Sequence, residues 1–161
     1  MVRYQVESLP GHDLGAVVPG LPPGMIDDPE VRTALYDLWI DKGVVVFKEL
    51  AGLDTQLRLS EIFGEPAEHP LLVGVQQERT HHVIADIEYD KEDGDLYLVN
   101  GEVRGGYLPW HFDLAYIDKI NHGGILRPHA LPGRGGETGF IDQITTYESL
   151  PQRLKDEIGD L

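Results

Sequence analysis

Apolar residues recur at helical spacing near the start of the chain and at shorter, strand-like intervals through its middle. The clearest helical segment follows a stretch rich in proline and glycine, residues 19–29, which we interpret as a loop. Asp28 can cap this helix, Pro29 suits its first turn, and Gly43 supplies its end. Apolar residues repeat between them, at Val31, Ala34, Leu35, Leu38 and Trp39. The pattern predicts a helix from Asp28 to Gly43 that packs its apolar side onto a sheet.

Short apolar or β-branched runs predict strands. Val44–Phe47 follows a glycine and is apolar throughout, which favours a buried strand. A second helix is expected from Thr55 to Phe63, ending at Gly64. Further strands are expected at Val83–Ile87, Leu96–Val99, Ile125–Arg127 and Thr138–Ile141. Early helices followed by strands favour the α+β class and are compatible with a double-stranded β-helix, the jelly roll of cupin-like proteins, with flanking helices.

The last segment predicts another helix. Ser149 with Gln152 matches a capping box, and an apolar face follows at Leu150, Leu154, Ile158 and Leu161. Because the sequence stops while this face continues, we expect a jelly roll that is incomplete at its C-terminus and a chain that is the N-terminal part of a longer protein. A complete chain with an unfinished site is the alternative. Residues 1–161 are expected to form one domain, since a chain of this size buries about 68–70% of its unfolded surface.

The chain is strongly acidic, with 13 Lys and Arg against 28 Asp and Glu and a formal net charge of −15. Such a charge repels phosphate backbones and anionic lipids, so we expect no nucleic acid and no membrane partner. The sequence has no cysteine, no signal peptide and no apolar run long enough to span a bilayer. We therefore expect a cytoplasmic protein without disulfides or thiolate metal ligands. Homo-oligomerisation is left open.

The most informative chemical pattern is His111 and Asp113, two positions apart. On an extended strand both side chains would point to the same side, with Cα atoms roughly 6.5 to 7 Å apart. An imidazole and a carboxylate supply two of the three protein ligands of the facial triad that binds Fe(II) in non-haem oxygenases. The alternative is a histidine that is hydrogen-bonded to a loop carboxylate, because this short pattern is common.

Several motifs occur together in a characteristic order. They are Trp110–Asp113, Gly135–Phe140 and Tyr147–Pro151, preceded upstream by Gly43–Phe47 and Phe63–Pro70. In order and spacing they resemble the taurine dioxygenase-like (TauD/TfdA) family of Fe(II)/2-oxoglutarate-dependent dioxygenases. The resemblance spans nearly the whole chain and implies the double-stranded β-helix fold. It also implies Fe(II) as metal cofactor and 2-oxoglutarate as cosubstrate.

The resemblance implies roles for three residues around the metal. His111 and Asp113 would bind Fe(II), and Thr138 would help to bind the distal carboxylate of 2-oxoglutarate. A hydroxyl donates a hydrogen bond but brings no charge, so Thr138 alone cannot hold the cosubstrate. Family members carry a second iron-binding histidine and a 2-oxoglutarate-binding arginine further downstream, and neither can be assigned in this sequence. Gly135 and Gly136 are interpreted as a tight turn before the next strand.

The resemblance also points to a substrate pocket. His69 lies where taurine-type members place a histidine that contacts the anionic head of the substrate. Leu72 replaces the family's taurine-contacting tyrosine, and Tyr107 replaces its substrate-contacting asparagine. These departures argue against taurine and favour a larger or more apolar acid, with His69 and Tyr107 lining its pocket.

The implied reaction is hydroxylation of a C–H bond in a small, anionic organic acid such as a sulfonate, sulfate ester or carboxylate. It would consume O₂ and 2-oxoglutarate and release succinate and CO₂. Asp113 favours hydroxylation over halogenation, because related halogenases carry a small residue at that position. Two other classes stay open. One is a non-enzymatic or degraded jelly-roll binding module without a complete metal site, and the other is a cupin-like metalloenzyme with another metal and no cosubstrate.

The remaining histidines and a neighbouring aromatic residue are not assigned to the site. His81 and His82 would point to opposite faces of a strand and could not easily share one metal ion. His122 and His129 are separated by two glycines and a proline, so we assign them no metal either. Trp110 lies on the opposite strand face from His111 and is expected to pack against the protein.

Overall fold

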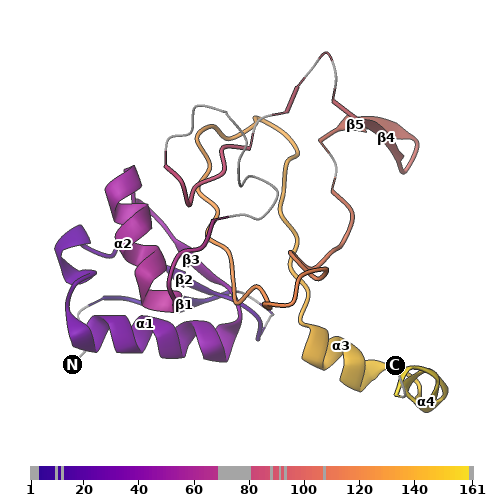
Figure 1. Ribbon diagram of the computed structural model, residues 1–161, viewed down its shortest axis with the longest axis horizontal. Coiled ribbons are helices and arrows are strands. Elements are labelled where there is room, and N and C mark those ends of the chain that lie inside the picture. The colour runs from indigo at the N-terminus through magenta and orange to yellow at the C-terminus, as the bar shows by residue number, and fades with distance from the viewer. Residues whose placement is uncertain are drawn as a thin grey trace. The chain divides into compact units, whose positions relative to one another are not determined.

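The computed structural model describes residues 4–9, 11, 13–68, 81–87, 89–90, 92, 94–106 and 108–159 (Figure 1). The chain forms two compact units, one of residues Met1–Phe63 and Ile125–Leu161 and the other of residues Gly64–Gly124. The elements are β1 (Glu7–Ser8), β2 (Ala16–Val18), the 3-10 helix η1 (Pro23–Met25), α1 (Pro29–Lys42), β3 (Val45–Phe47), α2 (Leu53–Phe63), β4 (Leu96–Val99), β5 (Glu102–Gly105), α3 (Gln143–Ser149) and α4 (Gln152–Ile158).

Helix α1 confirms the predicted helix and both of its end signals. The Asp28 carboxylate accepts a hydrogen bond of 2.9 Å from the backbone N–H of Glu30. At the other end Gly43 has a φ of 67°, a left-handed conformation that glycine adopts without strain. Val31 and Leu35 are buried on its inner side. The cap and the terminal glycine therefore fix where this helix begins and ends.

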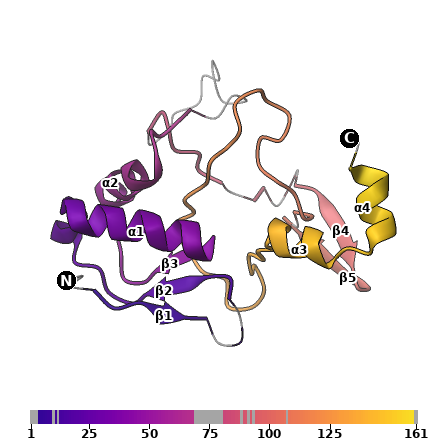
Figure 2. The same ribbon diagram turned by 90° about the horizontal axis from the view of Figure 1, so that it is seen from below.

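A three-stranded sheet with β2 at its centre supports the helices (Figure 2). Strand β2 pairs antiparallel with β1 and parallel with β3, with Val17 opposite both Glu7 and Val46. Helix α1 contacts both α2 and β3, as expected for an apolar stripe that packs on a sheet. The predicted strand at residues 44–47 is confirmed as β3. Its predicted burial is wrong, because β3 lies at the sheet edge and leaves Val46 41% exposed.

One hydrophobic core stabilises this part of the chain. It draws on the sheet, on both helices and on the proline-rich loop, whose Leu21 and Ile26 are almost fully buried. Burial of such side chains contributes about 1.5–3 kcal/mol each relative to exposure. Every hydrophobic residue that is buried in the described part of the chain lies between residues 16 and 62: Ala16, Val17, Val18, Leu21, Ile26, Val31, Leu35, Leu59 and Ile62.

Helix α2 confirms the second predicted helix and begins at Leu53, two residues before the predicted start. Trp39 links α1 to α2 through an edge-to-face contact with Phe63, with ring centroids 5.3 Å apart. The segment at Ile125–Arg127 also belongs to this unit, but the strand predicted there is not observed. Ile125 packs on the core, and the Arg127 Nε donates a 2.7 Å hydrogen bond to Gln56 on α2. Side-chain contacts, and not the backbone hydrogen bonds of a strand, therefore attach this segment to the unit.

Strand β4 confirms the prediction for Leu96–Val99, and β5 returns beside it as an antiparallel hairpin. The turn consists of Asn100 and Gly101, with φ values of 51° and 82°. Two positive φ values are typical of the tight turns that join hairpin strands, and Asn-Gly is their strongest sequence signal. The return strand could thus have been found from the sequence.

Two other predicted strands are wrong. Residues 83–87 and 138–141 have no regular secondary structure. The backbone at the first begins in a turn, closed by a 3.1 Å hydrogen bond from the N–H of Ile84 to the carbonyl of His81. Alternating or β-branched residues form a strand only when a neighbouring strand accepts their backbone hydrogen bonds, and the described residues offer none to these segments.

The C-terminal segment folds as two short helices, α3 and α4. Asp142 caps α3, and its carboxylate accepts hydrogen bonds from the backbone N–H groups of Ile144 and Thr145. The predicted capping box is wrong, because Ser149 is the last residue of α3 and its hydroxyl donates to the carbonyl of Thr146. Helix α4 begins after Pro151 without a side-chain cap.

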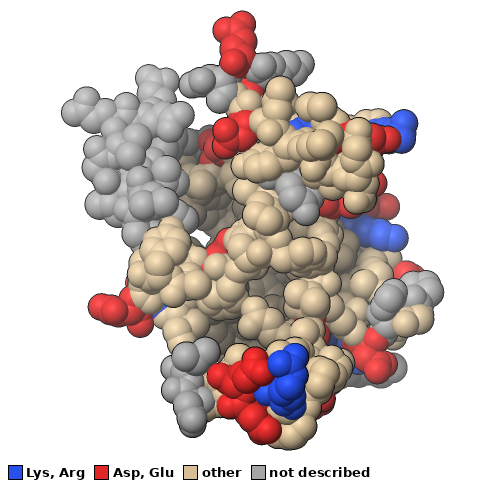
Figure 3. Space-filling model, turned by 90° about the vertical axis from the view of Figure 1, so that its right-hand side faces the viewer, with Lys and Arg blue, Asp and Glu red and all other residues tan. Residues whose placement is uncertain are grey.

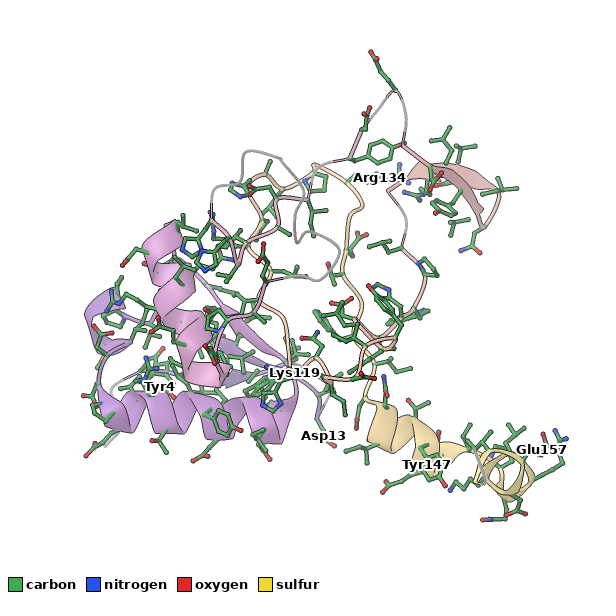
Figure 4. All side chains as sticks on the ribbon, in the orientation of Figure 1. Tyr4, Asp13, Lys119, Arg134, Tyr147 and Glu157 are labelled. Atoms are coloured by element: carbon green, nitrogen blue, oxygen red, sulfur yellow. The ribbon has the colours of Figure 1, made fainter. Side chains whose placement is uncertain are left out.

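The two short helices are joined by contacts of one lysine. The Lys155 Nζ donates a 2.8 Å hydrogen bond to the carbonyl of Glu148 and lies 5.5 Å from the ring centroid of Tyr147 on α3 (Figure 4). The described residues thus contain helices and two small sheets, as in an α+β protein. In the part of the chain described, no helix is long and apolar enough to cross a membrane.

Candidate metal centre

His111 and Asp113 lie in a loop that follows the hairpin. The strand geometry predicted for them is wrong, because residues 111 and 112 have no regular secondary structure and Asp113 starts a turn. Leu114 in that turn has a φ of 56°, and the N–H of Ile117 donates to the Leu114 carbonyl at 3.3 Å. A loop that leads into a turn, and not a strand, therefore carries both side chains.

The structure brings the two side chains together. The Nε2 of His111 lies 3.0 Å from the Oδ1 of Asp113. The other ring nitrogen, Nδ1, lies 2.7 Å from the carbonyl oxygen of Pro109. Both side chains are open to solvent, with exposed fractions of 51% for His111 and 65% for Asp113. The imidazole therefore has a partner at each ring nitrogen, and about half of its side chain is open to solvent.

This arrangement favours a positive charge between His111 and Asp113. When the imidazole is neutral, its one proton lies on Nδ1, which donates it in a hydrogen bond to the Pro109 carbonyl. Nε2 then carries a lone pair that faces the carboxylate. Two acceptors at that distance repel each other unless a cation lies between them. A proton is one such cation, and the pKa of His111 is raised, first by the hydrogen bond to the Pro109 carbonyl and then by the Asp113 carboxylate.

A divalent metal ion is the other cation that the pair fits. Donors at about 2.1 Å from a first-row metal ion, at right angles to each other, lie about 3.0 Å apart. The distance between Nε2 and Oδ1 equals that separation. The hydrogen bond from Nδ1 to a backbone carbonyl is also the usual arrangement behind a metal-binding histidine, since it fixes the tautomer and aims Nε2 outward. The donor set therefore fits two adjacent positions of an Fe(II) site.

The same 3.0 Å contact also satisfies the alternative of a hydrogen-bonded histidine in a loop. A facial triad needs a third protein donor. Across residues 4–159, the described positions contain no group of three or more His, Asp or Glu residues arranged to hold a metal ion. The pair thus offers two candidate ligands, and no third is found beside it among the described residues.

Thr138, the expected 2-oxoglutarate ligand, is exposed and lies outside any strand. It belongs to the unit of residues Met1–Phe63 and Ile125–Leu161, whereas His111 and Asp113 belong to the other unit. Gly135 and Gly136 have φ values of 75° and 79°, which glycine adopts without strain, but no turn is assigned to these two residues and no strand follows them. At Gly136 a Cβ would lie 2.8 Å from the ring of Pro132, so glycine is needed there for space as well as for conformation.

The two expected substrate contacts, His69 and Tyr107, lie outside the described residues. The expectation that His81 and His82 point apart is wrong. Their rings lie side by side with centroids 4.3 Å apart, because His82 begins a turn where the alternation of a strand does not apply. Trp110 was expected to pack, but 67% of it is exposed.

Sequence reasoning missed the carbonyl of Pro109. A backbone acceptor carries no residue-type signal, so only the folded loop reveals it. The nearest hint is the proline itself, which fixes φ two residues before the histidine and limits the conformations of the loop.

An accessible imidazole and carboxylate on adjacent metal positions define a candidate mononuclear metal protein. The family follows from comparison with known proteins. Residues 5–161 match the family model described as taurine catabolism dioxygenase TauD, TfdA family. The chain belongs to this family, whose members use Fe(II) and 2-oxoglutarate.

Curated relatives share low but extended identity with this chain. Pentalenolactone F synthase of Streptomyces avermitilis is 28% identical over 160 residues, which cover 95% of this chain and 50% of the relative. An alkylsulfatase of Acinetobacter baylyi is 27% identical over 157 residues, covering 95% and 44%. The (S)-phenoxypropionate/alpha-ketoglutarate-dioxygenase of Sphingobium herbicidovorans is 26% identical over 153 residues, covering 91% and 48%. The chain spans about half the length of the curated relatives it matches. No solved structure matches it.

Proposed function

We propose that this chain carries the first two metal ligands of an Fe(II)- and 2-oxoglutarate-dependent dioxygenase, as the N-terminal part of its jelly-roll domain. The enzyme would hydroxylate a C–H bond of a small, anionic organic acid. The observation that carries the proposal is the 3.0 Å separation of the His111 Nε2 and the Asp113 Oδ1, together with family membership. Residues 1–161 would lie in one domain, to which the three-stranded sheet and the hairpin both contribute.

His111 and Asp113 would hold Fe(II) through Nε2 and a carboxylate oxygen. Fe(II), when bound, supplies the redox chemistry by which O₂ converts 2-oxoglutarate to succinate and CO₂ and places the second oxygen atom in the substrate as a hydroxyl. The Pro109 carbonyl would keep the proton of neutral His111 on Nδ1, so that Nε2 stays available to the metal. The exposure of both ligands leaves room for the cosubstrate.

Thr138 would donate a hydrogen bond to the distal carboxylate of 2-oxoglutarate. Thr138 is exposed, and two glycines with positive φ values, Gly135 and Gly136, precede it. The charge of that carboxylate requires a cation as well, which we assign to an arginine of the whole protein. A further histidine of the whole protein would complete the metal triad.

The substrate class is proposed from the relatives and from substitutions in this chain. The relatives' names describe an alkylsulfatase and a phenoxypropionate dioxygenase, whose substrates by name carry an acidic group on an apolar body. We propose a sulfonate, sulfate ester or carboxylate with an apolar body larger than taurine, with His69 and Tyr107 lining the pocket. The acidic chain, with net charge −15, requires local cations to attract such an anion.

The test is Fe(II) binding under anaerobic conditions, measured by equilibrium dialysis of the purified chain. His111→Ala and Asp113→Ala should each weaken binding at least about tenfold, because each removes one of two donors. His129→Ala and Asp118→Ala are matched controls that should bind as the original chain does. Equal binding by all four variants would mean that the pair is only a hydrogen-bonded loop contact. In the whole protein, release of succinate from 2-oxoglutarate separates the dioxygenase from a binding module.

A further inference from the structure

The β4–β5 hairpin carries an apolar surface on one of its two faces. Paired residues in an antiparallel sheet point to the same face, as do alternate residues along one strand. Leu98 pairs with Val103, and Leu96 pairs with Gly105. Leu96, Leu98 and Val103 therefore share one face, and their exposed fractions are 68%, 75% and 68%. Side chains project from both faces of the hairpin in Figure 4.

Tyr89 extends this face at its glycine end. A Cβ built on Gly105 would lie 2.6 Å from the Tyr89 Cζ, so the ring occupies the space that a side chain at position 105 would need. Gly94 and Gly106 also lie against the ring. We call Tyr89, Leu96, Leu98 and Val103 the hairpin face. The absence of side chains at these glycines leaves the space that the Tyr89 ring fills.

The opposite face of the hairpin has a different character. It carries an ion pair between Arg104 and Glu102, with an Nη2 to Oε2 distance of 2.5 Å. The phenol of Tyr97 points to the same side, with its hydroxyl 3.4 Å from a carboxylate oxygen of Asp95. Charged and hydroxyl groups tolerate water, whereas three neighbouring aliphatic side chains do not. The two faces are therefore suited to solvent on one side and an apolar neighbour on the other.

A two-stranded hairpin is at best marginally stable alone in water. We propose that the hairpin face is a docking surface for the polypeptide that completes the family domain, namely the portion that relatives carry outside the half matched here. Pentalenolactone F synthase and the alkylsulfatase are covered by this chain to 50% and 44%, so each has at least as much chain again to supply the cover. The proposal rests on the part of the proposed function by which this chain is the N-terminal part of a longer domain, and not on the proposed activity.

Charge argues against a second copy of this chain as the occupant. Each copy carries a net charge of −15, and two copies would bring these like charges together across a small contact. Figure 3 shows that uncharged side chains, drawn tan, make up much of the surface on the side viewed, with acidic and basic groups between them. An occupant with an apolar surface needs no charge complementarity to fit the hairpin face.

The experiment compares hydrogen exchange in two chains by mass spectrometry. One is the 161-residue chain, and the other is the same chain fused to the part of Streptomyces avermitilis pentalenolactone F synthase that it does not match. Peptides covering Leu96–Gly105 should exchange at least about tenfold more slowly in the fused chain. Peptides from α1, which has its own core, serve as the internal folding reference. Iron binding is measured on the same samples, so failure of the metal site and failure of docking are separate results.

Matched variants identify the face that is covered. Leu98→Thr lies on the hairpin face and should abolish the slower exchange, whereas Tyr97→Thr lies on the opposite face and should retain it. In the unfused chain, Leu98→Thr should also reduce the fluorescence of bound anilinonaphthalene sulfonate more than Tyr97→Thr does. The proposal is overturned if the fused chain protects α1 but not the hairpin, or if both variants behave alike. Concentration-dependent protection in the unfused chain, with a dimer by light scattering, would overturn it in favour of a second copy.

Discussion

The Nε2 of His111 faces the Oδ1 of Asp113 at 3.0 Å, and the Nδ1 of the same ring faces the Pro109 carbonyl at 2.7 Å. These two contacts act on the same proton equilibrium but come from chemically different partners. One can be removed by substitution, and the other is part of the backbone.

Asp113→Ala should lower the pKa of His111 without returning it to its ordinary value. The substitution removes both the hydrogen bond and the charge of the carboxylate, and leaves the Pro109 carbonyl, the largest single cause of the raised pKa, in place. A raised pKa means that the protonated ring stabilises the loop at pH values below the ordinary value, and that this contribution is lost as the pH rises through the raised value. Titration of the His111 ring protons by NMR measures the change. An unchanged pKa of His111 in the Asp113→Ala variant would contradict the contact between His111 and Asp113.

Asp142 should make helix α3 sensitive to acid. The pKa of Asp142 is lowered from 3.8, first by the hydrogen bond from the Thr145 hydroxyl and then by the backbone N–H of Ile144. The charged cap therefore stabilises α3 above the ordinary pKa, and this contribution is lost as the pH falls through the lowered value. Cα chemical shifts of Gln143–Ser149 between pH 2 and pH 6 would show the transition, which we expect below about pH 4.

Asp142→Asn provides the matched control for this acid response. Asparagine caps helices about as well as aspartate but does not titrate. We expect the variant to keep α3 helical at neutral pH and to lose the acid transition. Asp142→Ala should lose helicity at every pH. Loss of the helix in the asparagine variant would show that charge, and not the cap geometry, holds this helix.

Leu35→Ala should destabilise the core by about 2–5 kcal/mol, the usual range for removing a buried leucine side chain. Leu35 is fully buried on α1 between the sheet and α2. Ile40→Ala on the same helix is the control, because Ile40 is 59% exposed and its loss should change stability by less than about 0.5 kcal/mol. Urea unfolding followed by Trp39 fluorescence measures both variants. Similar urea midpoints for the two variants would mean that Leu35 is not part of the hydrophobic core.

Gly94→Ala should disrupt the loop that leads into the hairpin. An added Cβ would lie 2.2 Å from the backbone carbonyl oxygen of Asp90, which the Gly94 N–H contacts at 2.9 Å. The backbone must move to relieve this clash, and Tyr89 must move with it. Gly124→Ala, with no atom near the added Cβ, should leave the hairpin unchanged. Amide chemical shifts of β4 and β5 report the effect. Equal spectra for the two variants would mean that Gly94 does not lie against Asp90 and Tyr89 as described.

Local signals predicted the N-terminal fold well. Helix α1 follows from Asp28, Pro29 and Gly43 because a cap, a fixed φ and a left-handed terminal residue act within a few residues of the chain. Strands were predicted less reliably. Leu96–Val99 pairs with a return strand that begins three positions after Val99, whereas Val83–Ile87 finds no partner among the described residues. A strand is a property of two segments, and periodicity in one of them cannot supply the second.

In the candidate site, too, the sequence predicted a local feature but not the backbone structure around it. The convergence of His111 and Asp113 was predicted, but from strand alternation, whereas the two residues lie in a loop that leads into a turn. Short spacing constrains which side chains can meet, while the backbone path between them depends on the surrounding loop. The contact between the His111 ring and the Pro109 carbonyl could not be predicted, because every residue has a backbone carbonyl.

The exposure of the His111–Asp113 pair bears on which ion reaches it. One nitrogen and one oxygen donor, open to water on their outer side, impose no coordination geometry of their own. Affinity at such a pair rises from manganese and iron through cobalt and nickel to copper, so these two ligands alone would rank iron near the bottom. If the pair binds iron as proposed, iron loading would depend on cellular metal supply and on the rest of the coordination sphere. Nickel-affinity purification would then place a competing ion in the site.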